Sequence, residues 1–236
     1  MTADPIVFLP GLACDARVFL PQIVRLCAAH PVQVIVPRGE SVEQMSSAVL
    51  AAAPPRFVLV GQGLGGDVAL DVIRRDLGRV IRVALISTDP LAEPPGLAAA
   101  RETRMVAARA GRLRDALAQD YPMSAFAETP WRDDVLSLVA DMGIGLGEGV
   151  YLRQARALQR RPDQQKTLRR AMLPALILAG AQDTVIPVRR QDFAATLMPF
   201  GTLKVIENAG QLPSLEQPDA VTDALASFFA GPLLLR

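Results

Sequence analysis

The chain has 236 residues, half of them hydrophobic, and its 25 basic residues nearly balance 24 acidic ones. This length fits one domain of generous size, and the composition excludes a disordered chain. The formal net charge of +1 gives no indication of nucleic acid or a membrane surface as a partner.

No apolar stretch reaches the roughly 18 residues that a membrane-spanning helix needs. The first eleven residues, MTADPIVFLPG, carry no basic segment before their apolar part, which is unlike a signal peptide. The two cysteines, Cys14 and Cys27, predict no disulfide framework. We therefore expect a cytoplasmic protein.

Short apolar runs alternate with helical segments in the first ninety residues. The runs predict strands at 5–10, 33–37, 56–61 and 80–88. Helices are expected at about 15–29, at about 42–53 behind a capping box that starts at Ser41, and from the glycine turn to about 77. Continuously apolar strands that alternate with helices indicate a parallel sheet with helices on both faces.

Residues 91–172 contain no strand-like run and predict a helical cap inserted after the fourth strand. Its helices are expected at about 97–110, 112–120, 131–142 and 147–160, and its many arginines on a solvated surface. The α/β alternation then resumes, with strands at 174–180 and 202–207 and with helices that begin at Pro187 and Pro218. We expect 1–90 and 173–236 to form one α/β core.

The segment RFVLVGQGLGGDVAL (residues 56–70) predicts a strand, a sharp turn and a helix. Gly61, Gly63 and Gly66 match the dinucleotide fingerprint G-x-G-x-x-G, and Asp89 follows about where a ribose-binding acid belongs. The same turn matches the nucleophile elbow G-x-S-x-G if Gly63 replaces the serine. The fingerprint usually opens the first βαβ unit, whereas this turn follows the third strand, so dinucleotide binding is the weaker alternative.

Four segments resemble the α/β-hydrolase superfamily, in particular its small capped bacterial members. In chain order they are FLPGLACDARVF, VLVGQGLGGDVAL, LILAGAQDTVIP and IENAGQLPSLEQPDAV. They correspond to the oxyanion loop, the nucleophile elbow, the turn with the triad acid and the loop with the triad histidine, which is the order of that fold. The resemblance implies a doubly wound, mostly parallel six-stranded sheet of order 2-1-3-4-5-6, a helical cap, and relatives that hydrolyse carboxylic esters.

The triad positions that this resemblance assigns are Gly63, Asp183 and Gln211. Glycine offers no nucleophilic oxygen, and glutamine cannot take a proton near neutrality. Only the acid is retained, and we expect Gln211 to donate a hydrogen bond to it in place of the histidine. The resemblance also implies that the backbone N–H groups of Leu12 and Leu64 still form an anion or carbonyl site at a helix N-terminus.

Other side chains are weaker candidates. His30, the single histidine, is expected on the surface, at the wrong end of a strand for this fold. Cys14 is expected to be a buried structural residue and Asp15 a helix cap. Asp67, one helical turn beyond the elbow, is expected to face away from the site. Cap residues that could line a pocket, with a core or surface role as the simpler interpretation, are Tyr121, Trp131, Tyr151, Arg153 and Gln154.

The resulting expectation is a protein without serine-hydrolase activity. It would bind a small, largely apolar ligand with one anionic or carbonyl group, without a cofactor, metal, nucleic acid or membrane. One alternative is rewired chemistry, a lyase or proton-transfer step with Asp183 as base, because desolvation raises the pKa of an unpaired carboxyl. Another is an engineered or inactivated variant of an active esterase.

Overall fold

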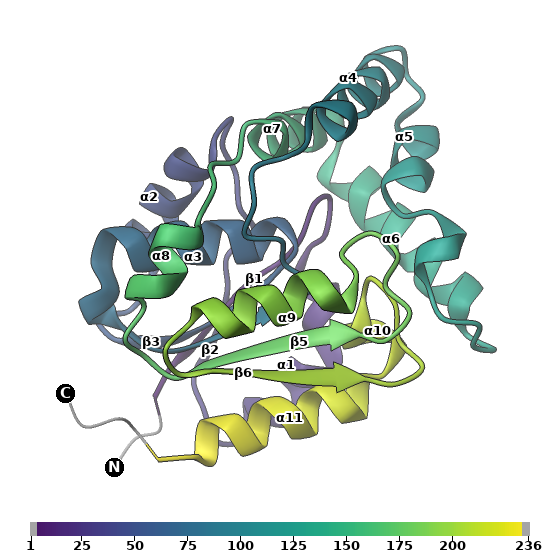
Figure 1. The fold of residues 1–236 in the computed structure, drawn as a ribbon. Coiled ribbons are helices and arrows are strands. Elements are labelled where there is room, and N and C mark those ends of the chain that lie inside the picture. Colours follow the sequence, from purple (N-terminus) through teal and green to yellow (C-terminus); the bar gives the residue numbers. More distant parts are fainter. Residues whose placement is uncertain (1–3, 233–236) are drawn as a thin grey trace.

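The computed structural model describes residues 4–232, which form a doubly wound α/β fold (Figure 1). Within this part of the chain a six-stranded sheet has the order β2-β1-β3-β4-β5-β6, with all neighbouring strands parallel. The predicted fold and strand order are therefore confirmed. The strands are β1 (Ile6–Leu9), β2 (Val32–Val34), β3 (Phe57–Gln62), β4 (Val80–Ile86), β5 (Ala175–Gly180) and β6 (Gly201–Ile206).

Helices cover both faces of the sheet and the ends of its strands (Figure 1). They are α1 (Leu20–Leu26), α2 (Val42–Ala52), α3 (Leu64–Asp76), α4 (Pro95–Arg109), α5 (Leu113–Asp120), α6 (Arg132–Leu146), α7 (Glu148–Gln159), α8 (Gln165–Arg170), α9 (Val188–Leu197), α10 (Pro213–Glu216) and α11 (Pro218–Ala230). Because side chains alternate across a strand, β1 supplies Val7 and Leu9 to one buried cluster and Ile6 and Phe8 to the other. The first cluster lies under α2, α3 and α9, and the second under α1 and α11.

The first predicted helix is shorter than expected. Residues 16–19 form a 3-10 turn, and α1 follows and ends at Leu26. Asp15 caps this turn as predicted, since its carboxylate accepts the N–H of Arg17 at 2.9 Å. Ser41 caps α2, but the reciprocal bond of Gln44 goes to the N–H of Glu40.

The chain between β4 and β5 is helical, and α4, α5, α6 and α7 lie over one end of the sheet (Figure 1). The short α8 packs instead on α3 and α9. Helix α6 continues to Leu146, past the expected end at 142. Gly143 lets it pack closely on α5, since a Cβ there would lie 2.6 Å from Leu117 Cδ1. The division into core and cap stays an interpretation, and residues 1–3 and 233–236 of the predicted core lie outside the described residues.

No single helix within residues 4–232 has the length and apolar character to cross a membrane, although α6 and α7 together meet that test with a 105° bend between them.

The turn between β3 and α3 has the geometry expected of an elbow. Gly63 has φ +52° and ψ −119°, a conformation that glycine adopts without the strain that a side chain would add. Two further glycines bring α3 against the sheet: a Cβ on Gly65 would lie 1.9 Å from the carbonyl oxygen of Leu9, and one on Gly66 would lie 1.9 Å from Thr88 Oγ1. The N-terminus of α3 is thereby fixed beside β1 and β4.

We expect Gly65→Ala to destabilise the fold by about 3 kcal/mol or more, because the added methyl group meets backbone rather than a movable side chain. Urea unfolding followed by circular dichroism measures this loss. Gly96→Ala, in α4, is the matched control, since nothing lies within 4 Å of its Cβ position. Equal unfolding midpoints for the two variants would contradict the close approach of α3 to the sheet.

Candidate functional site

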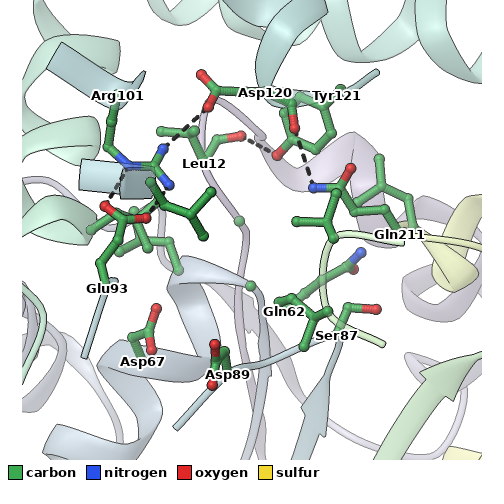
Figure 2. A pocket seen from close by; sticks show the side chains of 18 of the residues that line it. Leu12, Gln62, Asp67, Ser87, Asp89, Glu93, Arg101, Asp120, Tyr121 and Gln211 are labelled. Atoms are coloured by element: carbon green, nitrogen blue, oxygen red, sulfur yellow. Dashed lines mark hydrogen bonds and ion pairs between the residues drawn. The ribbon is translucent and has the colours of Figure 1, made fainter. Parts of the chain in front are cut away.

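A cavity of about 460 Å³ lies between the carboxyl ends of the strands and the cap. Four of the predicted site residues, Leu12, Gly63, Leu64 and Gln211, line it, whereas Asp183 does not. Figure 2 shows charged and polar side chains of the cap around the open centre of this cavity. The structure therefore brings together most of the site that the sequence predicted.

The elbow forms one wall of the cavity. The position of a Cβ on Gly63 is open, because its nearest neighbours are Gly11 Cα at 3.9 Å and the carbonyl oxygen of Ser87 at 4.0 Å. Leu64 is the first residue of α3, so its N–H has no acceptor within the helix. This wall can therefore donate a hydrogen bond to a ligand but offers no side-chain nucleophile at the turn.

The cap holds the opposing loop in place. Tyr121 Oη donates to the carbonyl oxygen of Leu12 at 2.6 Å. The buried amide of Gln154 accepts the N–H of Ala13 at 2.7 Å and donates to the carbonyl oxygen of Pro37 at 2.8 Å. Ala13 has a positive φ of 54°, which is unfavourable for a residue with a side chain. The bonds from Tyr121 and Gln154 hold the backbone of Leu12 and Ala13 in this conformation.

Asp183 follows β5 and is buried. Its Oδ1 accepts the N–H groups of Val185 and Ile186, both at 2.9 Å. Burial raises the pKa of Asp183 to about 6, against the effect of these two bonds. The nearby hydroxyl of Ser87 lowers the pKa of Asp183. Ser87 Oγ and Asp183 Oδ2 do not have the geometry of a hydrogen bond, and neither atom has another partner among the described residues.

Gln211 does not contact Asp183 in the way that the sequence predicted. Its side-chain nitrogen donates weakly to the carbonyl oxygen of Asp120 in the cap, at 3.4 Å, and its Oε1 has no partner within residues 4–232. A flexible amide lacks the second ring nitrogen with which an imidazole would bridge to the acid. Gln211 therefore extends toward the cap (Figure 2).

Glu216 fixes the loop that carries Gln211 and was missed in the sequence. Its Oε1 accepts the N–H groups of Ala127 and Gly210 at 2.8 and 3.0 Å, and its Oε2 accepts that of Leu212 at 2.9 Å. Burial raises the pKa of Glu216, although these bonds oppose the shift. No sequence signal distinguishes this glutamate from an exposed one, because its partners are backbone N–H groups, two in the loop just before it and one 89 residues away.

Most arginines between residues 91 and 172 are exposed as expected, but Arg101, Arg104 and Arg161 are not. Glu93 binds Arg101 at 2.6 Å and Arg161 at 3.2 Å, and Asp120 binds Arg101 at 3.1 Å and Arg104 at 2.9 Å. The side chains of this group are 1–13% exposed. Buried charges require such partners, and composition alone does not show which arginines will meet a carboxylate.

Asp89, the expected ribose-binding acid of the dinucleotide alternative, is also paired. Its carboxylate binds Arg190 at 2.9 Å and lies 3.6 Å from Arg161. The arginines pair with the carboxylate that would have to accept hydrogen bonds from a ribose. The structure therefore favours the interpretation of the glycine turn as a nucleophile elbow.

The prediction that Asp67 faces away from the site is wrong. Asp67 lies three residues after Leu64 and therefore on the same face of α3, where it lines the cavity with 5% exposure. Its backbone N–H donates to the carbonyl oxygen of Gly63 at 3.2 Å, but its carboxyl group forms no hydrogen bond or ion pair with the described residues. Burial raises the pKa of Asp67 to about 7, with Asp89 and Glu93 adding to the effect of burial.

Most of the weaker candidates lie outside the cavity wall. His30 binds the carbonyl oxygen of Asp4 at 2.9 Å, away from the cap. Cys14 is buried, as predicted, and burial raises its pKa to about 12. Of the cap residues proposed as pocket-lining, Tyr121 lines the cavity, whereas Tyr151 binds Asp120 and Trp131 binds the carbonyl oxygen of Glu216.

Residues 6–224 match the model of the alpha/beta hydrolase family. The chain belongs to the α/β-hydrolase family. Within this family it is 29% identical to a pimeloyl-[acyl-carrier protein] methyl ester esterase from Xanthomonas oryzae pv. oryzae, over 96% of this chain and 95% of the relative.

Solved α/β hydrolases share the fold. An enol-lactonase from Burkholderia xenovorans superposes with a TM-score of 0.85 at 22% identity, covering 98% of this chain and 93% of the lactonase. A thermophilic esterase from Thermogutta terrifontis superposes with a TM-score of 0.82 at 24% identity, covering 96% of this chain and 89% of the esterase. At these identities the likeness establishes the fold.

The raised pKa of Asp67 predicts a loss of stability with rising pH. Between the ordinary pKa of 3.8 and the raised value of about 7, Asp67 keeps its proton in the folded state and loses it in the unfolded state. The free energy of unfolding therefore falls as the pH rises across that range. Relative to Asp67→Asn, the wild type should lose about 3 kcal/mol between pH 5 and pH 8.5. Urea unfolding at several pH values measures the difference, with Asp76→Asn in the same helix as control. Parallel pH profiles for wild type and Asp67→Asn would contradict the burial of an unpaired Asp67.

Proposed function

We propose that this α/β hydrolase binds a small carboxylic or carbonyl compound in its cavity and lacks serine-esterase activity. The observation that carries the proposal is Gly63, which has the elbow's backbone conformation and no side chain. Gln211, on the loop opposite, cannot act as a general base. The triad positions are then Gly63, Asp183 and Gln211, and only the acid keeps its chemistry.

The ligand class follows from what the cavity retains. The N–H of Leu64 at the start of α3, with that of Leu12 on the facing loop, suits a carbonyl or carboxylate oxygen. The related methyl ester esterases act on a carboxylic ester, which supports an ester or the corresponding acid as ligand. The charged cap wall makes the ligand less apolar than the sequence suggested. We place the protein in the cytoplasm, without a cofactor or metal.

The first test is hydrolysis of p-nitrophenyl butyrate. We expect the wild type to hydrolyse the ester far more slowly than an ordinary esterase, because loss of triad members leaves at most about 10³–10⁴-fold catalysis over water even in a complete binding site. The double variant Gly63→Ser/Gln211→His should hydrolyse the ester at least about 100-fold faster than the wild type.

The two single variants are the controls, because nucleophile and base act as a unit and neither should restore the rate alone. Wild-type turnover of about 1 s⁻¹ or more would contradict the proposal. A fully active double variant would favour a recently inactivated or engineered esterase, and an inactive but folded one would favour a cavity that has diverged.

A second candidate is proton transfer with Asp183 as base. Its raised pKa of about 6 favours this role, although the carboxyl does not line the cavity. Exchange of the α-protons of 2-octanone with deuterium, followed by proton NMR, tests it. If Asp183 is the base, Asp183→Asn abolishes any protein-dependent exchange; equal exchange rates in wild type and variant exclude Asp183.

A further inference from the structure

The charges around Asp67 form a network that does not include it. Arg161 donates to Glu93 at 3.2 Å and lies against Asp89 at 3.6 Å. Arg101 binds the same Glu93 at 2.6 Å. Both cations that would stabilise an ionised Asp67 are therefore held by other carboxylates.

The carboxyl group of Asp67 has no hydrogen-bond or ion-pair partner in the described chain, although 95% of the residue's surface is buried. Figure 2 shows its carboxyl group at the edge of the open cavity, beside Asp89. A buried carboxyl without a partner favours its neutral form. It then presents an O–H donor to whatever occupies the cavity.

We propose that Asp67 forms a recognition site for a carboxylate head group, which binds together with one proton that the two carboxyl groups share. This inference rests on the proposed function, which puts a carboxylic or carbonyl ligand in the cavity. It adds a second recognition group, distinct from the elbow N–H groups, and a coupling between binding and pH.

The sign of the ligand charge follows from the network. Apart from Asp67, the connected ion pairs around the cavity contain one more cation than anion within residues 4–232. Their members are Arg101, Arg104, Arg161, Arg190, Asp89, Glu93 and Asp120. A carboxylate beside a protonated Asp67 balances this excess, whereas a cationic ligand would lie among three or more arginines. Two carboxyl groups in contact cannot both be ionised, so the anion binds with one proton.

Binding should weaken as the pH rises, because deprotonated Asp67 repels the anion. The groups that face Asp67 are Arg161 and Arg101, which favour its ionised form, and Asp89 and Glu93, which favour the protonated one. Octanoate is a suitable probe, since the cavity of about 460 Å³ accepts an alkyl chain beside Leu97 and Leu158.

The experiment compares octanoate, octanamide and octylamine by isothermal titration calorimetry between pH 6 and pH 9. We expect the affinity for octanoate to fall about 100-fold over this range, roughly tenfold for each pH unit above 7. Binding at pH 8 should take up about one proton, which titrations in two buffers of different ionisation enthalpy reveal. Octanamide, which carries no charge, should change by less than about threefold over the same range.

Two variants separate Asp67 from other titrating groups. Asp67→Asn keeps the shape and a hydrogen-bond donor, so it should bind octanoate with little dependence on pH. Asp76→Asn, at the far end of the same helix and outside the cavity lining, should keep the full wild-type dependence. Carbon-13 NMR of labelled aspartate carboxyl groups should also show a resonance that titrates near neutrality in the free protein and is lost in Asp67→Asn.

The outcomes distinguish this inference from the proposed function. If octanamide binds but the affinity for octanoate stays constant with pH, the inference is overturned and the proposed function stays intact. The same holds if the affinity for octanoate falls with pH equally in wild type and Asp67→Asn. Asp67-dependent binding of octylamine that strengthens with pH overturns it in favour of a cationic ligand. The absence of binding by octanoate and octanamide rejects the proposed function and the inference with it. If Asp67→Asn removes no near-neutral aspartate resonance, the inference fails whatever the ligands do.

Discussion

The close approach of α3 to the sheet is the constraint on which the site depends. Gly65 and Gly66 bring the helix within contact of β1 and β4, where any larger residue would meet the carbonyl oxygen of Leu9 or the side chain of Thr88. Gly63 reverses the chain between β3 and α3 with a positive φ. As a result the N-terminus of α3 opens into the cavity, with the N–H of Leu64 and the side chain of Asp67 on one face. The turn keeps this architecture without a nucleophile.

The cap does more than cover the cavity, because it holds the loops that form the walls. Tyr121 and Gln154 bind the backbone of the loop after β1, while Gln211 reaches from the loop after β6 to the cap. Glu216 joins that same loop to Ala127, at the base of α6. The helical segment between β4 and β5 is thereby joined to the loops after β1 and β6 by buried hydrogen bonds.

The buried carboxyl groups around this cavity differ in whether an arginine is paired with them. Glu93 has two arginine partners, Arg101 and Arg161, which hold the pKa of its carboxyl below the ordinary value although it is buried. Asp67 and Asp183 lack such partners, and burial raises the pKa of both toward neutrality. Of these two acids Asp67 lines the cavity, whereas Asp183, the acid that the family resemblance suggested, does not.

The sequence by itself determined the fold, the strand order, and the positions of Gly63, Asp183 and Gln211 along the chain. Hydrophobic periodicity and glycine spacing can be recognised in the sequence and predict the strands, the helices and the turn. The strand order and the triad positions are implied by the resemblance of four loop segments, in chain order, to α/β hydrolases. Tertiary structure decided which way Gln211 points, that Asp67 faces the cavity, that Glu216 holds the adjoining loop, and that a few of the cap arginines are buried. Several of these outcomes depend on partners far away in sequence: 19 residues for Arg101 with Asp120, 89 for Glu216 with Ala127 and 91 for Gln211 with Asp120. Burial and pairing of charge are properties of the packed molecule, and no spacing in the sequence encodes them.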